Sequence, residues 1–427
     1  MRSSAIIVSA LALMCGLPVY CQVTQESSPV PAAARDTTGF YSTLKENAPK
    51  HVNINNVPRF AVFGKEDKFY LGIGANITLV GEYDFGNPVP DANFFITSAI
   101  PMTVPAGNGA KMRFTAQQSG IYLNVVALPD SPNKIGAYVA FNFLNDNYSP
   151  YLEHAYLKFH DITAGYTYSL FSDVAAAPAL IDYEGPNSMA TIPHALIAYE
   201  PYLGKDKGWR LGVALELPEE SYTNAAHTAT VSQRIPDIPF YVQKLWASGA
   251  GWVRLAGMVR NLYYRNTLSS RNIDKVGWGI HASGKIPVTP SLSASFSAIY
   301  GEGIASYIQD INGEGMDLIP SGTGTDRLKA VKAWAAYGSL TYQFTPRLFS
   351  TATYSHVRAY APRYAASDNA PAWGENYSYA QYIAFNTFYQ INSIAQAGVE
   401  YLYGRRVDCN GNQAHDNRVE CMLRVSF

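Results

Sequence analysis

The sequence is poor in charged residues and in long apolar segments. Asp, Glu, Lys and Arg make up 15% of its 427 residues, and the formal net charge is −1. A near-neutral chain without a Lys/Arg cluster is not expected to bind nucleic acid. After residue 21 there is no run of about 20 apolar residues, which a membrane-spanning helix requires. The sequence therefore excludes a helical membrane protein.

Cysteine is also scarce, and two of the four cysteines lie within the first 21 residues. Residues 1–21 have the features of a cleaved signal peptide, with Arg2 before an apolar core at 5–19 and polar sequence afterwards. Cleavage after Cys21 fits the small-residue rule. Acylation of Cys21 in a lipoprotein is the alternative, which the bulky Tyr20 disfavours.

Two cysteines, Cys409 and Cys421, remain after processing. If residues 394–407 and 417–427 form two strands that pair along their full length, Cys409 lies in the loop between them. Cys421 then lies several residues down the strand and faces lipid. We therefore expect no disulfide, because the gap exceeds the Cα separation of about 7 Å that a bridge tolerates.

The low charge is balanced by 31 Tyr, 19 Phe and 33 Gly, and the mean hydropathy is −0.08. This composition is typical of a transmembrane β-barrel, because only alternate side chains of each strand face lipid. Residues 22–67 are polar, contain several prolines and show no apolar period. They are predicted to be an irregular periplasmic extension, and residues 68–427 to be the barrel.

The strand signal is clearest in residues 68–85. Leu71, Ile73 and Ile77 share one face, whereas Gly72 and Asn76 share the other, which is period-two alternation. Similar segments recur to give about 16 strands: 68–85, 111–128, 135–145, 152–160, 163–171, 192–200, 208–217, 239–247, 252–264, 274–286, 291–302, 328–344, 347–358, 378–390, 394–407 and 417–427. The predicted fold class is all-β, a transmembrane antiparallel β-barrel.

The connections between these segments fall into two length classes. Short turns such as the Thr345-Pro346 pair alternate with long stretches, namely 86–110, 172–191, 218–238, 303–327 and 359–377. Short turns at one end and long loops at the other are typical of outer-membrane barrels. The last segment alternates up to Phe427, which is the usual assembly signal of such barrels. The expected location is the bacterial outer membrane.

Several segments, in this order and spacing, resemble one family. They are FYLGIGANI at 69–77, KMRFTAQQSGIYL at 111–123, EHAYLKF at 153–159, ITAGYTYSLFSD at 162–173, ALIDYEGPNS at 179–188, and GVEYLYGRR with NRVECMLRVSF at the end. The chain resembles the DcaP-like group of trimeric outer-membrane porins, in a Bacteroidetes-type version. The resemblance implies a homotrimer of 16-stranded barrels, a third extracellular loop folded into each pore, and passive uptake of small, often anionic, solutes.

Two departures from the family pattern weaken this transfer. Family members often begin with a helical coiled coil, but residues 22–67 show no heptads. The family also tends to carry an arginine where the third loop returns to the wall. Here that stretch reads TIPHALIAYE, and His194 is the candidate.

The function expected from these observations is passive diffusion of small hydrophilic solutes through a pore in outer-membrane lipid, with a weak anion preference. No cofactor, no metal and no enzymatic activity are expected. Selectivity in a pore depends on its radius and on the fixed charges of its lining. The inward faces of the strands supply five basic candidates: Arg113, Lys158, Arg210, Arg254 and Arg260. The alternative is that charges near strand ends only solvate the rim.

Loop 172–191 is the candidate constriction. If it folds inward, Asp173, Asp182 and Glu184 offer carboxylates to the lumen opposite the basic wall. The alternative is an exposed surface loop whose acids face water.

Two other functions remain open at this point. A barrel protease or lipase needs a nucleophile beside a positioned base; His154, His160 and Ser172 are separate pieces that no motif joins. A surface-binding adhesin is the second alternative. A gated importer is excluded, because it carries a plug domain and about 22 strands.

Overall fold

The computed structural model describes residues 38–49, 60–63, 68–321, 326–361 and 376–427. The chain divides into two units, residues 1–39 and 40–427. Of the first unit only residues 38 and 39 are described, as the start of a helix. The predicted signal peptide, 1–21, lies outside the described residues. The barrel belongs to the second unit.

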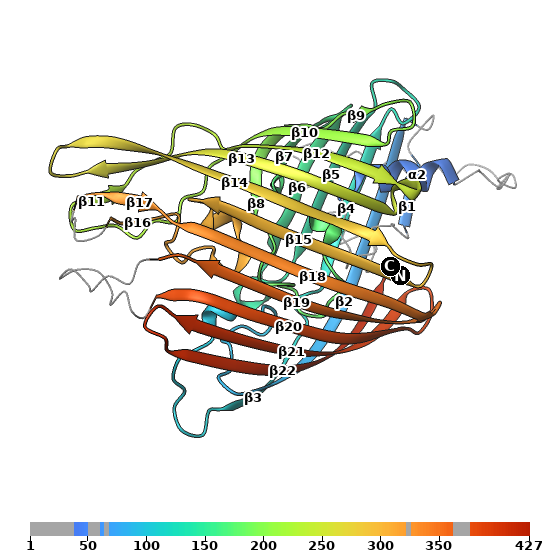
Figure 1. The fold of residues 1–427 in the computed structure, drawn as a ribbon. Helices are drawn as coiled ribbons and strands as arrows, with labels where there is room; N and C mark the ends of the chain where they lie inside the picture. The colour runs from blue at the N-terminus through green and yellow to red at the C-terminus, as the bar shows by residue number, and fades with distance from the viewer. Residues whose placement is uncertain (1–37, 50–59, 64–67, 322–325, 362–375) are drawn as a thin grey trace, which may run out of the picture. The chain divides into compact units, whose positions relative to one another are not determined.

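Sixteen antiparallel strands of the described chain close into a barrel (Figure 1), which confirms the predicted fold class. The first and last strands meet, since Asn76 pairs with Ser426 and Asp84 with Arg418. The strands are β2 (Phe69–Phe85), β3 (Ala110–Thr115) continued by β4 (Gly120–Ala127), β5 (Ile135–Asn142), β6 (Tyr151–Phe159), β7 (Ile162–Tyr168), β8 (Pro193–Tyr199), β10 (Trp209–Glu216), β12 (Ile238–Trp246), β13 (Gly251–Asn266), β14 (Arg271–Pro287), β15 (Leu292–Glu302), β18 (Lys332–Thr345), β19 (Leu348–Ala359), β20 (Tyr377–Gln390), β21 (Ala395–Asp408) and β22 (Gln413–Ser426).

The remaining elements are short. The strands are β1 (Phe60–Phe63), β9 (Tyr202–Leu203), β11 (Thr228–Thr230), and the pair β16 (Leu318–Pro320) and β17 (Leu328–Ala330). The helix α2 (Thr38–Asn47) is accompanied by single 3-10 turns at η2 (Thr97–Ala99), η3 (Asp146–Tyr148), η4 (Val174–Ala176), η5 (Ala247–Gly249), η6 (Ala305–Tyr307) and η7 (Gln309–Ile311). Within the described residues, no helix is both long and apolar enough to cross a bilayer.

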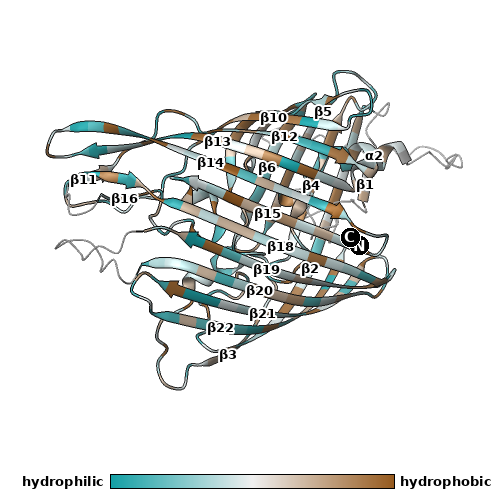
Figure 2. Cartoon of the chain, in the orientation of Figure 1, coloured by the Kyte–Doolittle hydropathy of each residue, from teal (hydrophilic) through white to brown (hydrophobic). Residues whose placement is uncertain are grey.

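Side-chain burial alternates along the barrel strands. In β2, Ile77 and Leu79 are exposed on the outer face, whereas Asn76, Thr78 and Glu82 are buried inside. The front wall shows the same mixture of apolar and polar positions along each strand (Figure 2). A strand whose apolar face meets lipid and whose polar face meets the lumen needs this period.

The connections confirm the predicted asymmetry between the two ends. One end carries short turns, such as 160–161, 346–347 and 391–394, and the C-terminus lies at this end (Figure 1). The other end carries the long loops 86–109, 169–192, 217–237 and 303–331. We call these four L1, L3, L4 and L6.

The N-terminal extension differs from the prediction of an irregular segment. It contains the helix α2 and the strand β1, and β1 pairs with the short-turn end of β2 from Phe60↔Ile73 to Phe63↔Tyr70. A ten-residue helix and a four-residue strand are too short to leave a periodic signal. Both depend on contacts with the barrel, which the sequence of the extension does not show.

Two strand limits also differ from the prediction. Residues 328–330 were expected to begin a barrel strand, but β17 pairs with β16 inside L6. The predicted strand 111–128 is split at 116–119, where β2 changes its partner from β3 to β4. Cys409 is buried in the loop between β21 and β22, and Cys421 faces outward from β22 opposite Val399. The two cysteines form no disulfide.

We expect the outer wall to reject charge according to depth. Leu340, near the middle of β18, and Phe344, near its end, are both about half exposed on the outer face. Leu340→Arg should destabilise the barrel by about 2–4 kcal/mol, because arginine at the midplane of the bilayer is poorly solvated. Phe344→Arg, nearer the interface, should cost about 0–1 kcal/mol. Urea titration in lipid vesicles measures both, and equal losses would contradict this placement.

Candidate functional site

Three of the long loops fold into the barrel. L1, L3 and L6 place Phe95, Phe171 and Tyr307 in the interior, each completely buried. Phe171 and Tyr307 pack edge to face, with ring centroids 6.0 Å apart. They share one apolar cluster with wall residues of β8, β10, β12, β13, β15, β18, β19 and β20. The structure therefore places the candidate constriction loop inside the lumen, and it adds L6 beside it.

The carboxylates of Asp182 and Glu184 are buried. Asp182 accepts hydrogen bonds from the Tyr382 hydroxyl (3.0 Å) and from the Phe95 backbone N–H (3.0 Å). Burial raises the pKa of the Asp182 carboxyl to about 6. Glu184 is buried beside it, and burial followed by the charge of Asp182 raises the pKa of Glu184 well above its usual value. The expectation that these two acids face the lumen is therefore wrong.

Asp173 is the acid of L3 that remains beside open space. Its Oδ2 accepts hydrogen bonds from the Trp252 indole (3.0 Å) and the Ser283 hydroxyl (2.7 Å), and the residue lines a cavity described below.

A single carboxylate of L6 joins two loops to the wall. Asp310 accepts hydrogen bonds from the Thr97 hydroxyl (2.6 Å), the Ser98 backbone N–H (2.8 Å) and the Tyr377 hydroxyl (2.8 Å). Thr97 in turn accepts a hydrogen bond from Asn187 of L3. This role of L6 was not predicted from the sequence. Its signal is the apolar series Ile304, Ile308 and Ile311, which is too rich for a loop that faces water.

Two of the predicted basic lining residues, Arg113 and Arg260, have a structural role in ion pairs. Arg113 pairs with Glu82 and Asp84, and it donates to the carbonyls of Val89 and Pro90. Arg418, which the prediction omitted, pairs with the same two acids at 3.1 and 2.6 Å. These arginines neutralise buried carboxylates and offer little net charge to a solute.

Arg260 is likewise buried. It pairs with Asp237 (2.9 Å) and Asp317 (3.2 Å), and its Nη1 donates to the Ser306 hydroxyl (2.8 Å). His194 accompanies it: its ring stacks on Tyr307 at 4.8 Å, and its Nδ1 lies 3.1 Å from a carbonyl oxygen of L4. Both residues fix L4 and L6 to the wall. Neither lines the cavity, so their assignment to the constriction and the pore lining is wrong.

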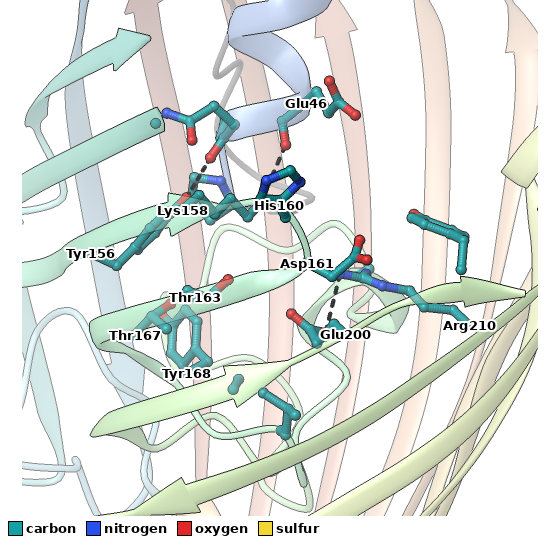
Figure 3. Close-up of a pocket in the computed structure, with 18 of the residues that line it drawn as sticks. Glu46, Tyr156, Lys158, His160, Asp161, Thr163, Thr167, Tyr168, Glu200 and Arg210 are labelled. Atoms are coloured by element: carbon teal, nitrogen blue, oxygen red, sulfur yellow. Dashed lines mark hydrogen bonds and ion pairs between the residues drawn. The ribbon is translucent and has the colours of Figure 1, made fainter. Parts of the chain in front are cut away.

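The other three basic candidates, Lys158, Arg210 and Arg254, line one cavity of about 960 Å³. It lies at the short-turn end, between α2 and the inner face of L3. The side chains labelled in Figure 3 project from α2, β6, the β6–β7 turn, β7, the β8–β10 connection and β10. Arg210 pairs with Glu200 at 3.2 Å. Arg254 stacks on Tyr241, 3.6 Å from the ring centroid, and donates to the carbonyl of Leu170.

Basic residues outnumber acidic ones in the lining of this cavity. Six lysines and arginines face four aspartates and glutamates: Lys45, Lys134, Lys158, Lys207, Arg210 and Arg254 against Glu46, Asp161, Asp173 and Glu200. Among the described residues no group of three His, Cys, Asp or Glu is arranged to hold a metal ion. The cavity offers charged groups and hydroxyl groups to a solute.

A closed 16-stranded barrel with loops folded inside it and a charged cavity is the architecture of a porin. Residues 115–410 match the family model described as the porin subfamily. The match covers more than half of the chain, so the chain belongs to this family and is an outer-membrane porin.

Solved structures with the same fold agree. The outer-membrane channel DcaP of Acinetobacter baumannii is 21% identical, with a TM-score of 0.71 over 86% of this chain and 100% of that chain. OmpT of Vibrio cholerae (TM-score 0.51, 11% identity) and Salmonella typhi OmpF in a complex with daunomycin (0.50, 12%) each cover 86% of this chain and 100% of their own. No curated protein sequence matches the chain.

The buried Arg260 supports a stability prediction. Arg260→Met leaves Asp237 and Asp317 without their cation, which should cost about 3–5 kcal/mol. Thermal unfolding of the purified barrel measures the loss. Arg347→Met, at an exposed turn, is the control and should stay within about 0.5 kcal/mol of the wild type. An Arg260→Met barrel as stable as the control would show that the ion pairs contribute nothing.

Proposed function

We propose that this porin conducts small hydrophilic solutes with a weak preference for anions, through the cavity at the short-turn end. The observation that carries the proposal is the excess of basic over acidic side chains in the cavity lining. Short turns face the periplasm in outer-membrane barrels, so this cavity is the periplasmic vestibule. Hydroxyl groups of Thr163, Thr167 and Ser169 offer further hydrogen bonds to a solute.

The expected preference is weak because two of the six lining cations are compensated by local ion pairs. Lys134 pairs with Glu46 at 2.8 Å, as Arg210 does with Glu200. The Debye length at physiological ionic strength is about 8 Å, comparable to the radius of a small pore, so part of the remaining field persists across the lumen. A small net positive field favours anions without excluding cations.

We also propose that the protein performs no chemistry. The hydroxyl of Ser172 has no hydrogen-bond partner in the described chain, and His154 Nδ1 lies 2.9 Å from Thr167 Oγ1 instead. Ser297 does contact His281 (2.8 Å), but both side chains are almost completely buried under Phe171. A nucleophile and its base must reach a substrate, and this pair is closed off. Hydrolysis assays on the purified protein test this proposal, and turnover of peptide or lipid would overturn it.

We infer a homotrimer, and within the family a DcaP-like, Bacteroidetes-type member. The strands β5 to β8 contain only 7–9 residues, whereas β18 to β22 contain 12–14. A tilted strand needs about 9–11 residues to cross the hydrocarbon. The short wall also presents the outward alanines Ala137, Ala155 and Ala164 between larger apolar side chains such as Leu157 and Ile197. A neighbouring subunit covers such a low apolar wall better than lipid does.

The trimer predicts an asymmetric response to bulk. Ala155→Trp on the short wall should break the trimer into monomers, because the indole holds the subunits apart. Ala298→Trp, outward-facing on β15, is the matched control and should leave the trimer intact. Light scattering coupled to size-exclusion chromatography measures the mass. A monomeric wild type, or two variants that behave alike, would contradict the proposed interface.

The anion preference predicts a shift in reversal potential. Lys158→Gln combined with Lys207→Gln removes two cations from the cavity lining, so the reversal potential in a salt gradient should move toward cation selectivity. Arg271→Gln with Arg347→Gln removes the same charge from exposed positions outside the cavity and should leave the potential unchanged. Planar-bilayer recording gives both values. If the lysine variant matches the wild type, the cavity does not determine selectivity.

A further inference from the structure

The helix α2 packs against the inner wall of the barrel. Phe40 and Leu44, one helical turn apart, are buried against Val126, which points inward from β4. The Phe40 ring also meets Tyr70 of β2, with centroids 4.9 Å apart. Residues four apart share one face of a helix, so α2 presents its apolar face to the wall.

Polar groups of the wall cap the end of α2. The last four carbonyls of a helix have no partner within it. Asn124 Nδ2 donates to the carbonyl of Leu44 (2.7 Å), and the Tyr156 hydroxyl donates to the carbonyl of Asn47 (2.7 Å). Lys158 Nζ lies 3.3 Å from the carbonyl of Glu46 (Figure 3), where a cation also complements the helix dipole. The barrel therefore supplies the C-terminal cap that the helix lacks.

A notch in the wall receives the side chain of Asn47. Its Nδ2 donates to Asn124 Oδ1 (2.6 Å) and to the carbonyl of Ala137 (3.1 Å). Gly136 of β5 lies against it: a Cβ at Gly136 would come within 1.9 Å of Asn47 Oδ1. Glycine inside a strand often marks a close approach by another segment. Glycine at position 136 of β5 thus leaves the space that the Asn47 side chain occupies.

The polar side of α2 faces the cavity. Thr43, Lys45 and Glu46 form part of the cavity lining, as do Asp161, Glu200 and Arg210. We propose that α2 is a second constriction of the pore, in series with L3, which limits size and contributes charge at the periplasmic exit. This inference rests on the proposed conduction through the vestibule. It makes Asn47 and Gly136 the residues that position the exit.

The wall residue Gly136 allows a test that leaves the helix sequence intact. Gly136→Leu should displace the Asn47 side chain and release α2 from the wall. The release should expose Lys45 to limited trypsin cleavage, and mass spectrometry identifies the cleavage site. Single-channel conductance should then rise above that of the wild type. Gly338→Ala is the matched control: it changes a strand glycine of β18 whose added Cβ meets nothing within 4 Å. It should alter neither cleavage nor conductance.

A deletion of residues 40–48 provides the second variant, in case Gly136→Leu does not assemble. It should give a folded barrel with a higher conductance and a changed reversal potential. If the deletion leaves both unchanged, α2 only supports the wall and the proposal is overturned. Cleavage at Lys45 in Gly136→Leu without a rise in conductance overturns it equally. A wild-type barrel that conducts no ions would instead refute conduction itself, so the two failures are distinguishable.

Discussion

The structure depends on one constraint, which is that every backbone N–H and C=O in the bilayer must find a partner within the protein. A closed sheet satisfies it, because it has no edge. The pairing of β2 with β22 closes the sheet, and the backbone of Ala75 exchanges two hydrogen bonds with Phe427 at the end of this seam. Since alternate side chains then point to lipid and lumen, the same constraint dictates both an apolar exterior and a polar interior.

The polar interior creates a second requirement, because buried charge must be neutralised. Glu82 and Asp84 of β2 are neutralised by Arg113 and Arg418, and Asp237 is neutralised by Arg260. These pairs fill the wall where L1, L4 and L6 meet it. A second set of charges, among them Lys158, Arg210 and Arg254, lines the vestibule below L3. The division explains why arginines with the same inward orientation have different roles, some holding loops and others facing solute.

Much of the fold could be predicted from the sequence, because a period of two is a local property. The faces of β2, the short turns and the strand count all follow from it. The docking of α2 could not be predicted from the sequence. Phe40 and Leu44 are buried by their contact with Val126, which lies far along the chain. The break of the predicted strand 111–128 into β3 and β4 at residues 116–119 could not be predicted for the same reason, because it depends on how these strands pair with β2.

The candidate site was predicted only in part. Inward orientation singled out Lys158, Arg210 and Arg254, which line the cavity, and the third loop folds inward. The partners of each charge were not visible. Asp182 is tied to Tyr382 and Phe95, and Arg260 to two acids from different loops. Such contacts join residues separated by tens to hundreds of positions, and strand periodicity carries no information about them.

The hydrogen-bond network around Asp310 limits how freely the extracellular loops of this protein can change in sequence. Extracellular loops usually tolerate insertions and sequence drift, because they touch little else. Here L1, L3 and L6 share hydrogen bonds through Thr97, Asn187 and Asp310. An insertion in one of them disturbs all three. The hairpin tip between β13 and β14 contacts L4, where the Thr267 N–H donates to the carbonyl of His227, but these residues are not among those that hydrogen-bond through Asp310. Leu268 at this tip is 64% exposed, so new epitopes or affinity tags are best accommodated there.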